Sequence, residues 1–267
     1  MPQSPNTNLH AFNLALRTLL SHPSHLLPHL TIPTFAHLPE VIGPHLHCSS
    51  STSPGSPAAP PTCNSKQPPT PEPKPRTPEI KALVLDKDNT LSPPKTTYLP
   101  PPILTKLHHL TTSPTSPFNQ TRNPNSILIV SNRAGSHPKY NPEIASLESQ
   151  LSSQNLSVPI FRLPPGAVKK PFCEKEVVEW FVERGVVREA SEIAVVGDRI
   201  GTDALLARRM GSWCVWTRDG VWGDGVLDLS AREVHGKRGV LEKMEVFVEG
   251  FLRERCGLRP VGPKGWE

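Results

Sequence analysis

A short apolar run that ends in two aspartates constrains this chain more than any other feature. Residues 80–85 read I-K-A-L-V-L, the pattern of a buried strand, and Asp86 and Asp88 follow at once in the run D-K-D-N-T. Side chains two residues apart in an extended segment point to the same side. Two carboxylates held there repel each other unless a cation or a shared proton lies between them. An Asx turn on a solvated loop is the ordinary alternative, but the pattern favours a Mg²⁺ site.

This arrangement predicts a specific division of chemistry between the two aspartates. Asp86 would attack a phosphorus atom, and Asp88 would handle the proton of the leaving group. A difficult hydrolysis is then divided into formation and breakdown of an aspartyl-phosphate.

Proline divides the chain into unequal parts. More than half of its 33 prolines precede residue 80, and residues 48–79 carry almost no large apolar side chains. Such a segment cannot bury enough surface to offset the entropy of the chain. We therefore predict an amphipathic N-terminal segment at 1–47, a disordered Pro/Ser-rich tether at 48–79 and one catalytic domain at 80–267, which is long enough for a substantial core.

Charge and cysteine content narrow the choice of partners. The formal net charge is +5 and the pI about 9.0, with no long run of Lys and Arg. An anionic substrate or a membrane surface explains this positive charge as well as a nucleic acid does, so no nucleic-acid partner is expected. The five cysteines form no C-x-x-C pair, which argues against a zinc ribbon or a disulfide scaffold and fits a reducing compartment. No run approaches the roughly 20 apolar residues of a membrane span, so any membrane contact is expected to be peripheral.

The N-terminal segment has an unusual composition. Residues 1–39 contain no Asp or Glu and many Ser, Thr and His, and on a helix Phe12, Leu16 and Leu20 share one face. Organelle targeting, docking at a membrane interface and packing against the catalytic domain all fit this pattern, and the sequence leaves them open. The histidines between His22 and His47 lack regular ligand spacing, so no metal site is predicted there.

Strand-like and helix-like segments alternate after residue 80. Apolar strand patterns recur at 126–130, 158–161, 192–197 and 213–217, and helical spacing occurs at 101–110, 141–152, 174–184 and 202–210. This alternation predicts an α/β fold with a Rossmann-like, doubly wound parallel sheet. Pro159 places the third strand at an edge or at a bulge. Trp213, Trp216 and Trp222 are expected in the core or as surface anchors rather than in a substrate box.

Polar clusters follow the later strands as well. Ser131 and Asn132 come directly after the second strand, where a hydroxyl and backbone N–H groups can hold a phosphate, although a helix cap has the same composition. The fourth strand runs into G-D-R-I-G-T-D, where Asp198 and Asp203 can complete an oxygen shell around Mg²⁺. Asp203 alone also fits the first turn of a helix.

A lysine pair lies between these two clusters. Lys169 and Lys170 precede a helix that is expected to start at Pro171. Such pairs are usually solvated, but a lysine here can neutralise phosphoryl oxygens and the nucleophilic carboxylate together. The order of carboxylate pair, serine, lysine and carboxylate pair, each at a strand end or helix start, predicts one composite site.

These motifs resemble the four motifs of the haloacid dehalogenase superfamily of phosphatases over about residues 80–225. The combination V-L-D-K-D-N-T-L, S-N-R-A-G, K-K-P and V-V-G-D-R-I-G-T-D is similar, more narrowly, to the mitochondrial phosphatidylglycerophosphate phosphatases of fungi and plants. The spacing of about forty residues from Asp88 to Ser131, and again from Ser131 to Lys170, leaves no room for a separate cap domain. An open site of this kind suits a phosphate that is presented at a membrane or on a macromolecule.

The resemblance implies a role for each matching residue. Asp86 would be nucleophile and Mg²⁺ ligand, and Asp88 the general acid/base with its carbonyl on Mg²⁺. Ser131 and Asn132 would bind phosphate. Lys170 would neutralise the negative charge of the site, with Lys169 as the alternative for this role. Asp198 and Asp203 would be metal ligands. The roles of Arg133 and Arg199 in the motif loops stay open.

The resemblance also implies a reaction and a place for it. Phosphatidylglycerophosphate would be hydrolysed to phosphatidylglycerol on the route to cardiolipin, by a peripheral protein on the matrix side of the mitochondrial inner membrane. Its partner would be an anionic phospholipid at a membrane surface. An uncapped phosphatase that acts on phosphoprotein or nucleic-acid phosphate ends is the alternative within enzymes. A silent binding module is disfavoured because every motif residue is present.

Overall fold

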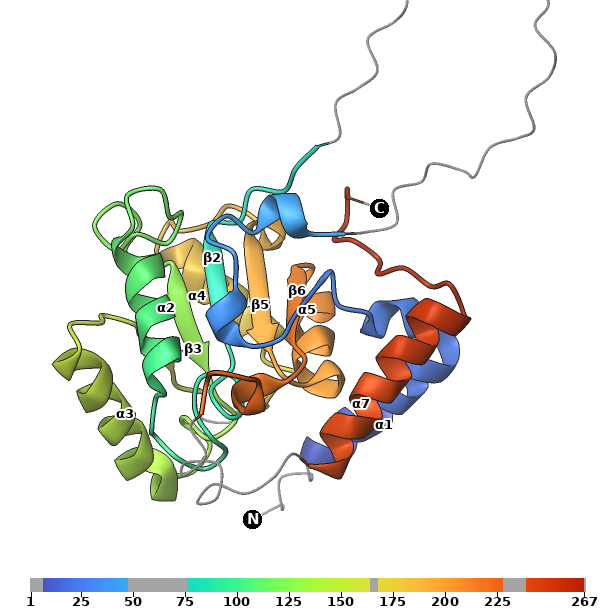
Figure 1. The fold of residues 1–267 in the computed structure, drawn as a ribbon, viewed down its shortest axis with the longest axis horizontal. Helices are drawn as coiled ribbons and strands as arrows, with labels where there is room; N and C mark the ends of the chain where they lie inside the picture. Colours follow the sequence, from blue (N-terminus) through green and yellow to red (C-terminus); the bar gives the residue numbers. More distant parts are fainter. Residues whose placement is uncertain (1–6, 48–75, 164–167, 228–238, 267) are drawn as a thin grey trace, which may run out of the picture.

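A parallel sheet with helices on both faces forms the body of the molecule (Figure 1). The computed structural model describes residues 7–47, 76–163, 168–227 and 239–266. The predicted tether at 48–79 therefore lies almost wholly outside the described residues. The strands are β1 (Leu30–Ile32), β2 (Ala82–Leu85), β3 (Ile127–Val130), β4 (Ile160–Phe161), β5 (Ile193–Gly197) and β6 (Trp213–Thr217).

Six α-helices surround these strands in the described residues. They are α1 (Thr7–Ser21), α2 (Pro101–Thr112), α3 (Asn141–Ser153), α4 (Glu174–Glu183), α5 (Leu205–Met210) and α7 (Val240–Gly250). Two π-helical turns, Ile200–Ala204 and Phe251–Arg255, adjoin α5 and α7. The short 3-10 helices are Pro23–Leu26, Phe35–His37, Gly43–His45, Pro138–Tyr140, Ala190–Glu192 and Gly220–Trp222.

The strand order places the predicted motif loops at one edge of the sheet. The order is β1-β6-β5-β2-β3-β4, and every pair is parallel. After β2 the chain adds β3 and β4 on one side, and then crosses back to add β5 and β6 on the other. In such sheets ligands bind beyond the carboxyl ends of the strands, at the point where the order reverses. That point lies between β2 and β5, where Asp86 and Asp198 follow their strands. The doubly wound α/β prediction is confirmed, and no cap domain covers this edge in the described residues.

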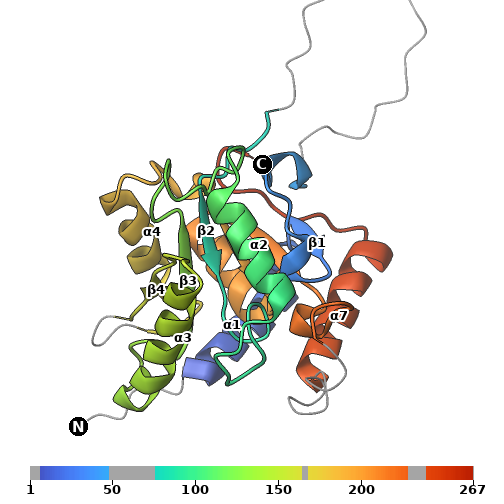
Figure 2. The same cartoon turned by 60° about the vertical axis from the view of Figure 1, so that its left-hand side comes forward.

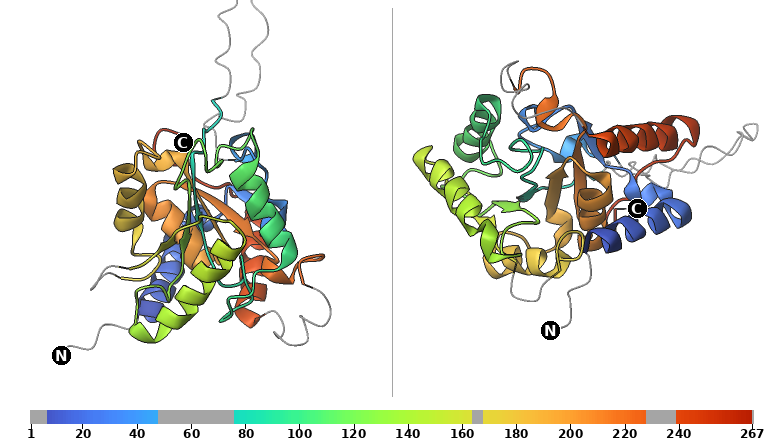
Figure 3. Two further views of the ribbon diagram at one scale, coloured as in Figure 1. Left: turned by 90° about the vertical axis from the view of Figure 1, so that its left-hand side faces the viewer. Right: turned by 90° about the horizontal axis from the view of Figure 1, so that it is seen from below.

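Both faces of the sheet are buried, as the continuous apolar strand patterns predict. Leu83 and Leu85 of β2 point into a core with α2 and α3, whereas Ala82 and Val84 point into a core with α4 and α5. Figures 2 and 3 show α2 and α4 on opposite sides of the sheet. Trp213 and Trp216 of β6 are fully buried core residues, as expected.

Part of the N-terminal segment belongs to the sheet rather than preceding it. Strand β1 pairs with β6, and Phe35, Leu38 and Ile42 are buried in the same core as α2. The sequence pattern predicted five strands after residue 79 and did not predict this sixth one. The boundary at 47/48 therefore does not separate the catalytic fold from a leader; residues 22–47 complete its edge.

Two helices from opposite ends of the chain lie on the same side of the molecule, near β6 (Figures 1 and 3). Leu14, Ala15 and Leu19 of α1 and Val246 of α7 pack against the core that contains α4 and α5. Of the three roles that the sequence left open for the N-terminal segment, packing against the catalytic domain is therefore confirmed for the face of α1 that carries Leu14, Ala15 and Leu19. Among the described residues, no helix combines the length and hydropathy that a bilayer span requires.

The described elements differ from the expected ones at two places. Helix α4 begins at Glu174 rather than at Pro171, because Phe172 donates its backbone N–H to Lys169 O at 2.9 Å and so closes a separate turn. The expected helix at 202–210 starts as the π-helical turn Ile200–Ala204 before α5. The prediction of β4 as an edge strand is confirmed by the strand order.

A buried histidine joins the N-terminal segment to the sheet and to the C-terminal tail. The backbone N–H of Cys214 donates to His29 Nδ1 at 3.0 Å, so Nε2 carries the proton and donates to Val261 O at 3.0 Å. The His29 ring also packs edge-on against Trp213. Burial lowers the pKa of His29 to about 4; the hydrogen bond to Val261 O opposes this shift, and the positive charges of Arg208 and Arg253 add to it.

We expect this histidine to make the fold acid-sensitive. The unfolded chain binds a proton at His29 below about pH 6.5, whereas the folded chain resists it, so stability is lost as pH falls from 7 towards 4. At pH 5 the loss is about 2 kcal/mol relative to pH 7. Urea unfolding at both values should show that the stability advantage of wild type over His29→Gln shrinks at pH 5. The exposed His45→Gln is the control, and an advantage independent of pH would contradict the assignment.

Candidate active site

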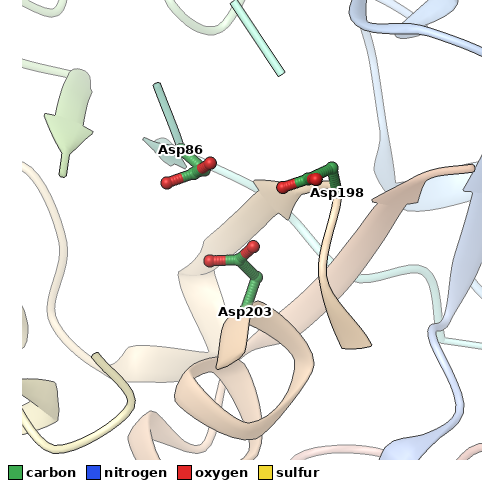
Figure 4. Close-up of side chains that lie close together, drawn as sticks. All are labelled: Asp86, Asp198 and Asp203. Atoms are coloured by element: carbon green, nitrogen blue, oxygen red, sulfur yellow. The ribbon is translucent and has the colours of Figure 1, made fainter. Parts of the chain in front are cut away.

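Three carboxylates from two strand ends meet at the switch point of the sheet. Asp86 follows β2, Asp198 follows β5, and Asp203 lies in the π-helical turn that leads into α5. Their side chains face one another (Figure 4), and one oxygen from each lies within 4.8 Å of the others. All three are largely buried. The three side chains that the sequence predicted as metal ligands are thus brought together, and the assignment of the Asp88 carbonyl to the metal stays a prediction.

A buried lysine contacts two of these carboxylates. The Lys170 ammonium forms a short ion pair with Asp86 and a 2.8 Å pair with Asp203. Burial alone would lower the pKa of Lys170, but Asp203 and Asp86 raise it above its usual value, so the ammonium stays charged. Lys169 is half-buried and has no such contact among the described residues. Lys170 is therefore the lysine of the site.

The cluster contains more negative charge than its lysine can balance. Burial raises the pKa of Asp86 to about 7, an effect that Lys170 opposes and Asp203 reinforces. Burial and the neighbouring Asp86 raise the pKa of Asp198 well above its usual value. Carboxylates that are held together in this way favour a bound cation, because it removes the repulsion between them.

Asp198 is fixed by residues from outside its own loop. Asn89 donates its side-chain N–H to Asp198 Oδ2 at 2.8 Å, and Trp216 donates its indole N–H to Asp198 O at 2.8 Å. Asn89 has a φ of 65°, in the left-handed region that asparagine tolerates better than most residues. Sequence analysis did not identify Asn89 as a site residue. Its place directly after the D-x-D pair, in a turn that needs this conformation, was the available signal.

The loop after β5 depends on a glycine and on a residue from α7. A Cβ on Gly197 would lie 2.3 Å from Asp203 Oδ2, so only glycine lets Asp203 turn back over the strand end. Gly201 donates its backbone N–H to Glu245 Oε1 of α7 at 2.9 Å. Burial raises the pKa of Glu245 to about 7. Glu245, which the sequence did not single out, thus supports the loop that carries Asp198 and Asp203.

Asp88 lies beside the carboxylate cluster but its side chain points elsewhere. Its Oδ1 accepts the backbone N–H of Lys95 at 2.9 Å and lies 3.0 Å from Lys87 Nζ, and its Oδ2 lies 3.7 Å from Arg133 Nε. The prediction that Asp86 and Asp88 flank one cation does not hold for these two carboxylates. The backbone therefore places the Asp86 carboxylate in the charged cluster and the Asp88 carboxylate in a polar network at the rim of that cluster.

The two phosphate-binding candidates after β3 have different surroundings. Ser131 is buried, and its hydroxyl accepts the backbone N–H of Arg133 at 3.3 Å. Asn132 Oδ1 accepts the backbone N–H of Lys170 at 2.9 Å. The side-chain oxygen of Asn132 therefore holds the lysine loop in place. Its assignment as a direct phosphate ligand stays a prediction, as does that of Ser131.

The donor set suits a hard divalent cation. Asp86, Asp198 and Asp203 offer only carboxylate oxygens, and the described residues bring no His or Cys ligand into the cluster. Asn89 Oδ1 is buried beside Asp198 and finds no hydrogen-bond partner in the described part of the chain. Magnesium prefers a few such oxygens and retains its other ligands as water, so the residues present fit it.

Comparison with known proteins identifies the family. The family model described as mitochondrial PGP phosphatase matches residues 9–222, which include β1 and every site residue discussed so far except Glu245. The chain belongs to the mitochondrial PGP phosphatase family. The match starts inside α1, so the N-terminal segment is part of what this phosphatase family shares.

Individual relatives agree with the family assignment. A mitochondrial phosphatidylglycerophosphatase of Saccharomyces cerevisiae is 37% identical over 142 residues, which is 53% of this chain and 69% of the yeast protein. A Schizosaccharomyces pombe protein named "Probable phosphatidylglycerophosphatase, mitochondrial" is 29% identical over 203 residues, 76% of this chain and 78% of its own. A solved protein of Mesorhizobium loti described as a "putative had-like phosphatase" has a TM-score of 0.37 and 17% identity, covering 64% of this chain and 87% of that one.

The contact at Gly197 gives a test of the carboxylate cluster. We expect Gly197→Ala to push Asp203 away from Asp86 and Asp198 and to weaken Mg²⁺ binding by about 10- to 100-fold, as loss of supporting contacts does in other metal sites. Calorimetric titration with Mg²⁺ measures this. Gly250→Ala is the matched control, because a Cβ there meets no atom within 4 Å. Equal affinities for the two variants would show that the three carboxylates do not form the metal site.

Proposed function

We propose that this protein removes the terminal phosphate of phosphatidylglycerophosphate, giving phosphatidylglycerol on the route to cardiolipin. The observation that carries the proposal is the buried Asp86–Lys170 pair at the switch point of a chain that belongs to the mitochondrial PGP phosphatase family. The proposed location is the matrix side of the mitochondrial inner membrane, which the names of the relatives support only as far as the mitochondrion.

In the proposed first step Asp86 forms the new bond to phosphorus. One Asp86 oxygen attacks, the bond from phosphorus to the glycerol oxygen breaks, and Asp88 gives that oxygen a proton. Lys170 neutralises the charge on the nucleophile and on the phosphoryl oxygens. The Ser131 hydroxyl, at the end of the neighbouring strand, would donate to one of those oxygens. In the second step Asp88 takes a proton from the water that hydrolyses the aspartyl-phosphate.

Asp86, Asp198 and Asp203 would hold the Mg²⁺ ion, together with the Asp88 carbonyl that the motif assigns to it. When bound, the ion would supply positive charge next to the phosphoryl oxygens. The raised pKa of Asp86, about 7, indicates that this carboxylate needs such compensation to act as an anion at neutral pH.

We expect Asp86→Asn to abolish phosphate release from phosphatidylglycerophosphate in mixed micelles, with a fall of about a thousandfold or more, because the amide cannot form the acyl phosphate. Phosphate release is measured with Mg²⁺ and with EDTA, and EDTA should stop the wild type as well. Glu183→Gln, which changes an exposed carboxylate on α4, is the control. Wild-type activity on a phosphopeptide or a nucleic-acid phosphate end, and none on the lipid, would favour the alternative substrate class.

The proposed lipid substrate requires contact with an anionic membrane surface. Leu9, Phe12, Leu16 and Leu20 form an exposed apolar stripe on α1, a helix without acidic residues. A second exposed apolar stripe lies on α7 and consists of Leu241, Met244 and Phe247, of which Phe247 is 73% exposed. Exposed apolar rows on two helices near one edge of a protein support interfacial docking. The absence of acidic side chains on α1 favours an anionic surface over a neutral one.

We expect Phe12→Ser and Phe247→Ser together to reduce binding to vesicles of phosphatidylcholine with phosphatidylglycerol several-fold, because less apolar surface enters the interface. Cosedimentation measures the bound fraction, and hydrolysis of soluble 4-nitrophenyl phosphate should be unchanged. Val182→Ser removes a similarly exposed apolar side chain from α4 and is the control. Unchanged vesicle binding would exclude α1 and α7 as the docking surface.

A further inference from the structure

A fully buried lysine lies between the two aspartates of the first motif. Lys87 has an exposed fraction of 0%, and its ammonium donates to Thr96 O at 2.7 Å and to Glu143 Oε1 at 2.7 Å. It also lies 3.0 Å from Asp88 Oδ1. Burying a lysine is costly unless its charge is matched and its donors are used. The ammonium of Lys87 meets both conditions, and one of its partners, Glu143, comes from a different part of the chain.

Glu143 contacts two cations at once. It lies in the first turn of α3, and its second oxygen accepts from Arg133 Nη1 at 2.7 Å. Arg133 belongs to the loop after β3, whereas Lys87 belongs to the loop after β2. Glu143 therefore connects two loops of the proposed site.

Both cations that Glu143 contacts also face the Asp88 carboxylate. Lys87 approaches its Oδ1, and Arg133 Nε lies 3.7 Å from its Oδ2. Two carboxylates and two cations thus form a closed network of zero net charge, and Asp88 is its most exposed member at 32% of its side chain. Glu143 is 17% exposed and lies behind the cations.

From this arrangement we propose that Glu143 is a positioning residue for Asp88. Glu143 takes up part of the charge of Lys87 and Arg133, so that Lys87 shares its ammonium between Asp88, Glu143 and Thr96 O, and Arg133 Nε stays 3.7 Å from Asp88. The Asp88 carboxyl then keeps the orientation in which it passes its proton to the leaving oxygen. Without the charge of Glu143, both cations would pair with Asp88 and hold its side chain away from that oxygen. The inference rests on the proposed function, because it assumes the acid role of Asp88.

The proposal predicts a dependence on the leaving group. When the phosphorus–oxygen bond breaks, its electron pair goes to the leaving oxygen. A glycerol oxygen needs the proton of Asp88 at that moment, whereas 4-nitrophenolate is a stable anion and needs none. A misplaced Asp88 should therefore slow formation of the aspartyl-phosphate from the glycerol ester and spare its formation from the nitrophenyl ester. This first step is read from kcat/KM, because hydrolysis of the aspartyl-phosphate, in which Asp88 is the base, is common to both esters. Simple loosening of the fold would slow both equally.

The test compares Glu143→Gln with wild type on two soluble esters, short-chain phosphatidylglycerophosphate and 4-nitrophenyl phosphate. We expect kcat/KM, which reports the step that releases the leaving group, to fall about tenfold or more on the first and less than about threefold on the second. Glu148→Gln is the matched control, since Glu148 lies on the same helix and pairs with exposed Arg162. It should behave as wild type on both esters.

The remaining outcomes are decisive too. Equal loss of activity on both esters, or no loss, would overturn the positioning role. If Glu143→Gln does not fold, Glu143→Asp keeps the charge and shortens the reach, and it should show the same split at smaller size; equal effects there would overturn the proposal. A wild type that releases no phosphate from the glycerol ester would instead refute the proposed function itself.

Discussion

The Lys170 ammonium, buried among carboxylates, is the interaction on which the rest of the site depends. It pairs with Asp86 from the end of β2 and with Asp203 after β5, and its backbone is held by Asn132 after β3. One residue therefore connects three strand ends, two through its side chain and the third through its backbone N–H. Removing one partner of a buried ion pair typically costs about 3–5 kcal/mol, because the other charge stays buried. The arrangement of these three strand ends therefore depends on neutralising the buried Lys170 ammonium.

Two neighbouring groups of charges have opposite character. The cluster of Asp86, Asp198 and Asp203 has one lysine for three carboxylates, so a further cation would balance its charge. In the network around Asp88, the two cations Lys87 and Arg133 balance the charge of the two carboxylates, Asp88 and Glu143, so no further ion is required. The turn in D-K-D-N-T separates them, because it sends alternate side chains of one short segment into different surroundings. Two aspartates that look equivalent in the sequence thereby acquire different chemistry.

The sequence predicted what depends on local patterns and missed what depends on distant contacts. Continuous apolar runs identified β2, β3 and β5, since burial on both faces leaves a clear signal. Strand β1 was not predicted because it is three residues long and lies between prolines, and only its pairing with β6 makes it a strand. Spacing could not separate Lys169 from Lys170. Asn89 and Glu143 gain their importance from partners 109 and 56 residues away, which no local pattern shows.

The place of β1 at the edge of the sheet limits where this chain can be cut. If proteolytic maturation removed residues up to about 21, it would take away α1 alone. A cut beyond Leu30 would remove the outermost strand and leave β6, still paired with β5, as an unpaired edge. Exposed strand edges recruit other chains and lead to aggregation. To keep β1, any presequence that this protein loses must end before Leu30, so the mature enzyme would retain residues that resemble a leader in composition.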